Sequence, residues 1–595
     1  MKHRIVVTGL VLLILIVSIT PGVHSEQGPI SRKVLPNAAQ SLAGMPELAR
    51  QRGDSIVIGV PDLFGETNPF WARTIGDEYL VSILYDELLF SNSNGEMGAG
   101  VATYEWTHVP AYDKFSQETN ARFVFSVRDN VCYEDGERVT SDDFINAIYL
   151  LAIPGFDGVY DISRAGIVGF EAYQNGESGI SGVERIDDRS FSVTFLGENP
   201  SNLDFFSFPA LRLSLFGDMK RPAEYTDENG NLDLQAAEAF YADSLARVRN
   251  TDATKMAYGQ YTLSNLQKGE QADFVANPSY WRGAPLIGSA QLLVVPVGRE
   301  FEAVVDGTVD IISLLGSINI VDANLEAGYT NLYTWEGDIV GFLGMDLKNP
   351  LFSDVSVRQA LAIGFNREKA RSMSTERYGK VPNVILFDAF SGKQAMYQEK
   401  YAFDLEKANT LLTEAGWILQ EDGFRYKDGE KFSFAITYNV PNPIFEKMLP
   451  VLSENYGALG LDVALNAVSF EALLEHVDQN AYDMVFQARR LPSSLTVAAN
   501  YFTPDSWLNP FPFADPWIEQ ALWLSTLEND PARQAVYLEM IFRELYESLP
   551  FIPIYRRMEM LLANARVMNI TVTTPHDITS DMYRFFLVDK LEGQF

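Results

Sequence analysis

The segment 258–296 places the strongest constraint on the fold, because it contains three apolar runs separated by residues that favour turns. The polar pair Lys268–Gly269 follows the first run and favours a tight turn. The aromatic pair Tyr280–Trp281 comes soon after the second run. Short apolar runs bounded by turn residues predict strands, here at residues 260–263, 271–276 and 291–295. Local chemistry alone therefore predicts a β-rich unit with an aromatic corner.

The length of the chain predicts more than one core. It has 595 residues, which exceeds the size at which a single hydrophobic core usually stops growing. Hydrophobic residues make up 47% of the chain, as expected for a packed globular protein rather than a disordered one. The net charge of −33 would repel the phosphates of nucleic acids and anionic lipids, so neither is expected as a partner.

Cysteine and histidine are too few and too scattered for a metal or redox motif. Cys132 is the only cysteine, which excludes an internal disulfide and every CxxC motif. His108, His476 and His576 are far apart, so we predict no metal site and no cofactor. GxSxG, HExxH and phosphate-loop motifs are missing as well. We predict that the chain has no catalytic residues and is not an enzyme; a secreted hydrolase using two carboxylates is the least favoured alternative.

One acidic segment, 227–238, has oxygen-bearing side chains at the spacing of a calcium loop. These residues are Asp227, Asn229, Asn231, Asp233 and Glu238. Leu232 stands where such a loop requires glycine. An Asn-Gly turn that leads into a capped helix explains the same residues, and we favour this explanation over calcium binding.

Residues 1–25 have the pattern of a secretory signal peptide. Lys2 and Arg4 precede an apolar run over residues 5–19, and the small residue Ser25 follows a Pro-Gly break. The run is short for a membrane span. We predict cleavage after Ser25, with an uncleaved anchor as the alternative; both place the remaining chain outside the cytoplasm, in the periplasm or the cell-surface space. No cysteine follows the run, which argues against a lipoprotein.

Further motifs occur in an order that resembles one known family. Residues 123–144 match a strand–turn–helix signature at Phe125, Arg128, Val131, Asp135, Gly136, Val139, Thr140 and Phe144. Residues 350–367 (PLFSDVSVRQALAIGFNR), 403–417 (FDLEKANTLLTEAGW) and 550–555 (PFIPIY) follow. Together they resemble the bacterial extracellular solute-binding proteins of family 5, the peptide and nickel receptors of ABC transporters. The segment 258–296 fits this family too, although Gln260 replaces its usual proline.

The resemblance implies an α/β periplasmic-binding-protein fold of two lobes with a two-segment hinge and an extra subdomain in lobe I. The implied parts are a linker (26–53), lobe I (54–88, 186–296 and 553–595), the extra subdomain (89–185) and lobe II (297–552). It implies that the ligand is enclosed between the lobes by a hinge motion. It also implies that ABC permease subunits at the membrane recognise the closed form, and we expect a monomer.

The resemblance also implies where the ligand lies. Peptide receptors of this family place an aspartate after the strand equivalent to 482–485, and its carboxylate pairs with the amino group of the peptide. Here Pro492 stands at that position, and Arg489 replaces a tryptophan. The predicted ligand-binding residues are Asn68, Phe70, Trp71, Ala488, Arg489, Arg490, Trp507 and Phe511.

The ligand itself stays open. The first hypothesis is an oligopeptide or similar oligomeric solute that is delivered to an ABC importer. A buried ammonium without the missing aspartate would be costly, which puts capture by the peptide N-terminus in doubt. The alternatives are an oligosaccharide stacked on the aromatic residues of 501–513, or an anion held by Arg489 and Arg490. A receptor that senses or chaperones would have the same sequence features.

Overall fold

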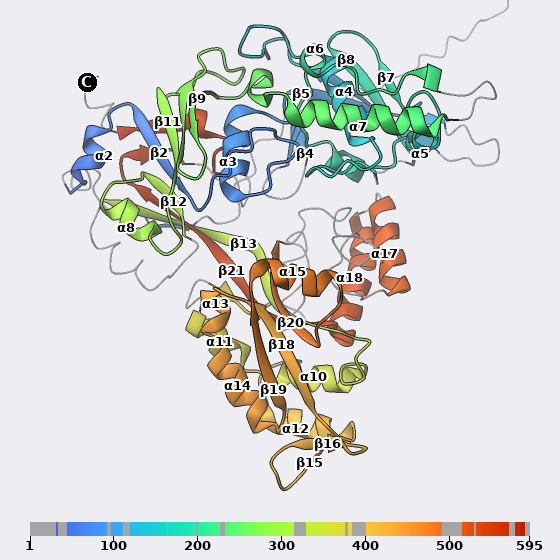
Figure 1. Cartoon of the computed structure of the whole chain (residues 1–595), viewed down its shortest axis with the longest axis vertical. Helices are drawn as coiled ribbons and strands as arrows, with labels where there is room; N and C mark the ends of the chain where they lie inside the picture. Colours follow the sequence, from blue (N-terminus) through green and yellow to red (C-terminus); the bar gives the residue numbers. More distant parts are fainter. Residues whose placement is uncertain are drawn as a thin grey trace, which may run out of the picture.

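The computed structural model describes residues 31–33, 44–91, 97–110, 119–163, 165–197, 200–225, 232–314, 329–374, 379–382, 400–490, 515–528, 531–570 and 578–588. In this part of the chain, the backbone forms two α/β lobes connected by long strands (Figure 1). The predicted signal peptide and the segment 491–514 lie outside the described residues. No described helix combines the length and the apolar character that are needed to cross a membrane.

One mixed sheet runs through both lobes. Its strands, in spatial order, are β19 (Asp462–Val468), β18 (Ser433–Asn439), β20 (Met484–Arg490), β13 (Thr330–Met345), β21 (Phe551–Asn564), β12 (Ile311–Ser313), β2 (Ser55–Val60), β11 (Ser289–Val294), β10 (Gln271–Ala276) and β9 (Tyr261–Gln267). Two short strands, β1 (Ser31–Lys33) and β14 (Gly379–Lys380), pair with β13 and β21. The first three strands belong to lobe II and the last five to lobe I.

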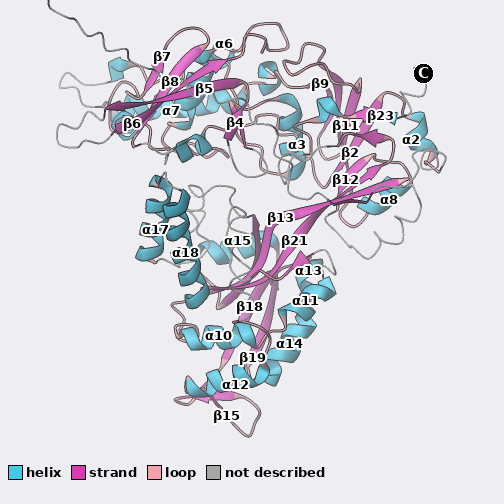
Figure 2. Ribbon diagram, turned by 180° about the vertical axis from the view of Figure 1, so that it is seen from behind, coloured by secondary structure: helices cyan, strands magenta, loops and turns pink. Residues whose placement is uncertain are grey.

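Strands β13 and β21 connect the lobes. They pair in antiparallel fashion along most of their lengths, and Figure 2 shows both passing from one lobe into the other. Tyr333 of β13 belongs to the core of lobe I, whereas Phe342 of the same strand belongs to the core of lobe II. Between them the register shifts from Glu336 to Val340, opposite Arg557. A bulge of this kind bends a strand locally, so we place the hinge at this position.

In lobe I, β2 lies between β11 and β12 and runs parallel to both. Its sequence, SIVIGV, is almost entirely apolar, as expected for a strand that is buried on both faces. Because the three strands are parallel, their carboxyl ends meet at one edge of the sheet. Helix α3 (Ile75–Leu84) follows β2 and helix α8 (Glu300–Val305) follows β11 along the chain.

The structure confirms the three strands predicted in the segment 258–296 as β9, β10 and β11. The aromatic corner has a partner that the local sequence did not show. Tyr280 and Trp281 donate hydrogen bonds of 3.2 and 2.6 Å to the buried carboxylate of Asp86. Burial raises the pKa of Asp86 to about 6, although both hydrogen bonds oppose this shift.

A separate antiparallel sheet forms the extra subdomain. Its strands, in order, are β5 (Ala102–Pro110), β6 (Thr119–Val127), β8 (Ser190–Phe195) and β7 (Val183–Arg185). The helices beside it are α4 (Ser141–Leu151), α5 (Phe170–Gln174), α6 (Leu213–Phe216) and α7 (Leu234–Asn250). Because β8 pairs with both β6 and β7, this sheet extends beyond residue 185, where the sequence placed the end of the subdomain. Its core is continuous with that of lobe I.

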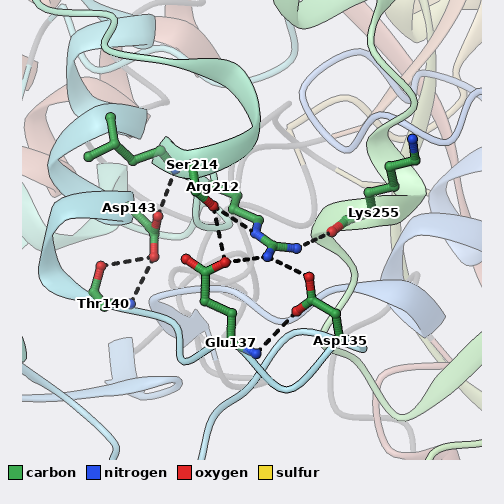
Figure 3. Close-up of polar contacts among 8 residues, drawn as sticks. Asp135, Glu137, Thr140, Asp143, Arg212, Ser214 and Lys255 are labelled. Atoms are coloured by element: carbon green, nitrogen blue, oxygen red, sulfur yellow. Dashed lines mark hydrogen bonds and ion pairs between the residues drawn. The ribbon is translucent and has the colours of Figure 1, made fainter.

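Residues of the 123–144 motif make framework contacts around α4 and α6 (Figure 3). The buried guanidinium of Arg212 lies 2.6 Å from the carboxylate of Asp135, and it also pairs with Glu137. It donates a further hydrogen bond of 2.8 Å to the carbonyl oxygen of Lys255. At the start of α4, Thr140 and Asp143 form a capping box. These contacts stabilise the subdomain.

Lobe II is built by the other motifs of the resemblance. Its helices are α10 (Val355–Ile363), α11 (Arg367–Ser374), α12 (Leu405–Glu414), α13 (Pro443–Glu446), α14 (Leu449–Ala458), α15 (Phe470–Asp478), α17 (Pro516–Leu527) and α18 (Pro531–Ser548). Asp354 caps α10 and Asp404 caps α12, each by accepting a hydrogen bond from a backbone N–H of the first turn. The buried face of α10 includes Val357 and Leu361. These motifs therefore fold and pack lobe II.

The strand pairing favours a later start of lobe II than the sequence analysis gave. The sequence placed it at residue 297, but β12 pairs with β2 and α8 packs into a small core beside these strands. We therefore propose that lobe II begins within β13.

The remaining elements are α2 (Glu47–Gln51), β3 (Leu89–Ser91), β4 (Met97–Ala99), β15 (Ile418–Leu419), β16 (Arg425–Lys427), β17 (Glu430–Lys431), β22 (Val567–Met568) and β23 (Phe586–Leu587), with 3₁₀ turns at Pro200–Phe205, Ala223–Tyr225, Ala253–Met256 and Met582–Arg584.

A buried ion cluster ties distant parts of lobe I together. Asp310 and Arg566 are both fully buried, and their charged groups lie 3.1 Å apart. Arg52 approaches the other carboxylate oxygen of Asp310 at 2.7 Å, and the backbone N–H of Val57 donates to that oxygen. Arg566 also donates to the carbonyl oxygens of Gly53 and Ser55. The start of lobe I, its central strands and the end of β21 are thereby joined.

Candidate functional site

A pocket opens where the carboxyl ends of the parallel strands meet the hinge. Pro61 and Val295 directly follow β2 and β11, Ser313 ends β12, and Ile339 and Arg557 come from the two hinge strands. The pocket holds about 660 Å³, its open mouth included. Ligands of open α/β sheets bind beyond the carboxyl ends of the strands, so the position of this pocket suits a ligand site.

Most of the pocket wall is apolar or aromatic. The residues of this kind are Pro61, Ile75, Tyr79, Val295, Ile312, Trp335, Ile339 and Ile578. Trp335 is half-buried and lies opposite Glu559 across the β13–β21 pair. A ring in this position can cover an apolar group or the face of a cation.

The charged residues that line the pocket are Glu78, Glu300, Arg557 and Glu559. Arg557 places one nitrogen 3.0 Å from each carboxylate oxygen of Glu559, so these two residues form a neutral pair. Both side chains of the pair are about nine-tenths buried, with exposed fractions of 11% and 10%. The other two charged residues are both acidic, which gives the lining a negative character.

Glu300 is the least satisfied of these carboxylates. The residue is only 5% exposed. One carboxylate oxygen accepts a hydrogen bond of 2.7 Å from the N–H of Gly298. The other, Oε1, is buried and has no hydrogen-bond partner among the residues that the structure describes, and no lysine or arginine in this set forms an ion pair with it. An unsatisfied buried acceptor costs about 1–3 kcal/mol, and more when it is charged.

The residues predicted from the first-lobe loop lie close to one another but pack inside lobe I. Asn68 is buried and donates a hydrogen bond of 3.0 Å to the carbonyl oxygen of Val248. Phe70 has no exposed surface. Trp71 is half-buried, and its indole N–H donates to Asp157 at 3.0 Å. None of the three lines the hinge pocket. Their contact with ligand stays a prediction, and Trp71 offers the most surface for it.

The residues predicted from lobe II lie at the end of β20, beside the hinge bulge. Ala488 is exposed and pairs with Gly341, and Arg489 pairs with Val340. The guanidinium of Arg489 donates a hydrogen bond of 2.7 Å to the side-chain oxygen of Gln487. Arg490 pairs with Ile339, which lines the pocket. Binding of an anion by these two arginines stays a prediction.

Two other predicted site residues, Trp507 and Phe511, lie outside the described residues, as does the first part (227–231) of the segment 227–238. Asp233, within that segment, caps α7 by accepting a hydrogen bond from the N–H of Ala236. This contact supports the turn-and-cap explanation at that position. The described part of the chain contains no cluster of three or more side chains that could hold a metal ion.

Sequence reasoning missed Glu300, Trp335, Arg557 and Glu559. Each belongs to an ordinary-looking segment, and the pairing of β13 with β21 that brings three of them together spans more than two hundred residues of sequence. One usable signal existed for Glu300. It follows closely after the end of the predicted strand 291–295, and the loop after such a strand is a usual ligand position in α/β sheets.

The fold agrees with comparisons to known proteins. Residues 100–514, more than half of the chain, match the model of the bacterial extracellular solute-binding proteins, family 5. The chain belongs to this family. Its members are solute-binding proteins that act outside the cytoplasm.

Among individual relatives, the chain is 27% identical over 236 residues to the oligopeptide-binding protein AppA of Bacillus subtilis, which covers 38% of this chain and 42% of AppA. It is 25% identical over 388 residues to the oligopeptide-binding protein OppA of Lactococcus lactis, covering 60% of each chain. The matched region spans less than two thirds of the length of either relative.

Solved structures extend the similarity of the fold over 90% of the chain. AppA of Bacillus subtilis in complex with a nonapeptide superposes with a TM-score of 0.66 at 18% identity, with 99% of that chain covered. OppA of Haemophilus influenzae in complex with the peptide RPPGFSPFR gives 0.65 at 19% identity, with 99% covered. The periplasmic EDTA-binding protein EppA gives 0.70 at 16% identity, with 97% covered. These similarities confirm the predicted two-lobed fold.

Proposed function

We propose that the chain is a receptor that captures an oligopeptide between its two lobes and delivers it to the permease subunits of an ABC importer. Its relatives are named for oligopeptide binding, and two similar structures hold peptides. The observation that carries the proposal is the hinge pocket, because the carboxyl edge of lobe I and both connecting strands meet there. A ligand in this position touches the segments that must move when the lobes close.

The proposal includes export and the absence of catalysis. The pattern of residues 1–25 supports secretion by a signal peptide. No cysteine follows the apolar run of this segment, which supports a protein that is not lipid-anchored. The missing catalytic motifs support a role in binding rather than turnover. In this proposal the protein is a monomer, and it binds the permease subunits when it carries a ligand.

A thermal-shift screen of the protein without residues 1–25 tests the proposal. The ligands are tri- to hexapeptides, α- and β-linked oligosaccharides, and nickel. A ligand that binds only the native state raises the Tm, by an amount that grows with its concentration. We expect peptides to raise the Tm and sugars and nickel to leave it unchanged. A rise with sugars or nickel and none with peptides would contradict the proposal.

A further inference from the structure

We propose that the hinge pocket binds a cationic group of the peptide, with Glu300 as its carboxylate partner. This inference rests on the proposed function and specifies which ligands the receptor favours: peptides that present an ammonium or guanidinium to the pocket. The sequence offers no aspartate at position 492, where the family resemblance places the usual partner of the peptide amino group. The structure offers a different carboxylate, in lobe I.

The first step of the argument is the state of Glu300. It is nine-tenths buried, it lines the pocket, and its Oε1 has no hydrogen-bond donor among the described residues. Buried carboxylates in folded proteins are normally paired with a cation or fully hydrogen-bonded. A donor that arrives with the ligand would complete this site, and a positively charged donor would do so most strongly.

The second step is the charge of the surroundings. Among the described residues, Arg557 is the only basic one that lines the pocket, and Glu559 neutralises it through two contacts of 3.0 Å. Glu78 adds a second acidic side chain to the same lining. An anion would meet unfavourable charge here, whereas a cation would meet favourable charge. The net charge of −33 on the whole chain also favours the approach of cationic peptides.

The third step is the shape and chemistry of the walls. Trp335, Tyr79 and several aliphatic side chains line the same pocket as the acidic groups. The aliphatic stem of a lysine or arginine, or the first residue of a peptide, can pack on these walls while its charged end reaches Glu300. Trp335 can also cover the cation with the face of its ring. A pocket whose lining combines apolar and acidic side chains thus suits this class of ligand.

Three random pentapeptide libraries, all amidated at the C-terminus, test the inference by thermal shift. The first has free N-termini and no Lys, Arg or His. The second is the same but N-acetylated, and the third is N-acetylated with one Lys at a fixed position. The variants are Glu300→Gln and the matched control Glu302→Gln, which makes the same change on an exposed side chain of the same helix. Near-UV circular dichroism checks that both variants fold.

We expect at least one cationic library to stabilise the wild type more than the neutral library does. In Glu300→Gln, the half-maximal concentration of that library should rise about tenfold or more, because a charged hydrogen bond is lost. In Glu302→Gln it should change by less than about twofold. Dependence on the free N-terminus identifies the peptide amino group as the cation, and dependence on Lys identifies a side chain.

Two outcomes overturn the inference, and they differ in what else they overturn. If all three libraries stabilise the wild type equally, and Glu300→Gln responds as the wild type does, the pocket does not select a cation and the proposed function stands. If none of the libraries stabilises the wild type, the proposed function fails as well.

Discussion

Two buried carboxylates lie ten residues apart in the sequence and differ in how they are satisfied. Asp310 is fully buried. Its carboxylate oxygens lie 3.1 Å from the guanidinium of Arg566 and 2.7 Å from that of Arg52, and one of them accepts a hydrogen bond of 2.9 Å from a backbone N–H. Glu300 is almost as buried, but only one of its oxygens accepts a hydrogen bond from the described residues. Among the described residues, both oxygens of Asp310 have partners, whereas one oxygen of Glu300 has none.

We interpret this difference as one of role: the buried charge of Asp310 supports the fold, and that of Glu300 serves ligand binding. A paired buried charge holds segments together, and removal of one partner leaves the other uncompensated. An unpaired buried charge lowers stability in the free protein, and it persists where a ligand can use it. Asp86 lies between these cases, because its partners are the neutral donors Tyr280 and Trp281.

The largest expected effect is on Asp310. The substitution Asp310→Asn should lower the free energy of unfolding by about 3–5 kcal/mol, because it leaves Arg566 buried without its counter-charge. Urea denaturation measures this change. The exposed Glu302→Gln serves as the control and should stay within about 0.5 kcal/mol of the wild type. If Asp310→Asn lowers the free energy of unfolding by less than about 0.5 kcal/mol, the proposed difference between Asp310 and Glu300 is wrong.

The second effect concerns Asp86 and depends on pH. Its pKa is about 6 in the folded protein, above its value in the unfolded chain, so its contribution is greatest at low pH and is lost as the pH rises through about 6. Between about pH 4 and pH 7, the wild type should lose up to about 3 kcal/mol of stability relative to Asp86→Asn. Denaturation curves of both proteins across this range measure the difference, and parallel pH profiles would refute it.

The third effect has the opposite sign. In the absence of ligand, Glu300→Gln should keep or raise the free energy of unfolding, by up to about 1 kcal/mol, because it removes an uncompensated buried charge. This is the same chemical change, carboxylate to amide, as in Asp86→Asn. A loss of several kcal/mol would instead show that Glu300 has a structural partner, and the comparison with Asp310 would fail.

The smallest effect is expected at Glu137. Its side chain is half-exposed, and Arg212 keeps Asp135 and the carbonyl oxygen of Lys255 when Glu137 is changed (Figure 3). The substitution Glu137→Gln should cost less than about 1 kcal/mol, since Glu137 is half-exposed and Arg212 keeps the carboxylate of Asp135 as its counter-charge. Thermal denaturation at low and high salt measures it. A cost comparable to that of Asp310→Asn would mean that burial does not decide the strength of these pairs.

Much of the fold could be predicted because it depends on local patterns. The strands of 258–296 follow from apolar runs and turn residues, and the caps at Asp354 and Asp404 follow from their positions before apolar helices. The two lobes follow from the order of motifs. What escaped prediction depends on long-range pairing. The motif 550–555 marks the start of β21, but the sequence does not show that β13 and β21 pair along most of their lengths across the hinge.

The candidate site was harder to predict for the same reason. The predicted residues came from loops that resemble ligand loops of the family, and Asn68 and Phe70 pack into lobe I. The pocket instead combines a short helix, three strand ends and two hinge strands. The burial of Glu300, and the lack of a donor to its Oε1 among the described residues, become visible only when these segments are placed in space.

Small-angle X-ray scattering of the exported protein, with and without a saturating peptide from the thermal-shift screen, tests the central claim most directly. If the two lobes close on a peptide held at the hinge, the radius of gyration should fall when the peptide is added, and it should stay unchanged with a peptide that does not raise the Tm. A peptide that stabilises the protein and leaves the radius of gyration unchanged would contradict capture between the lobes.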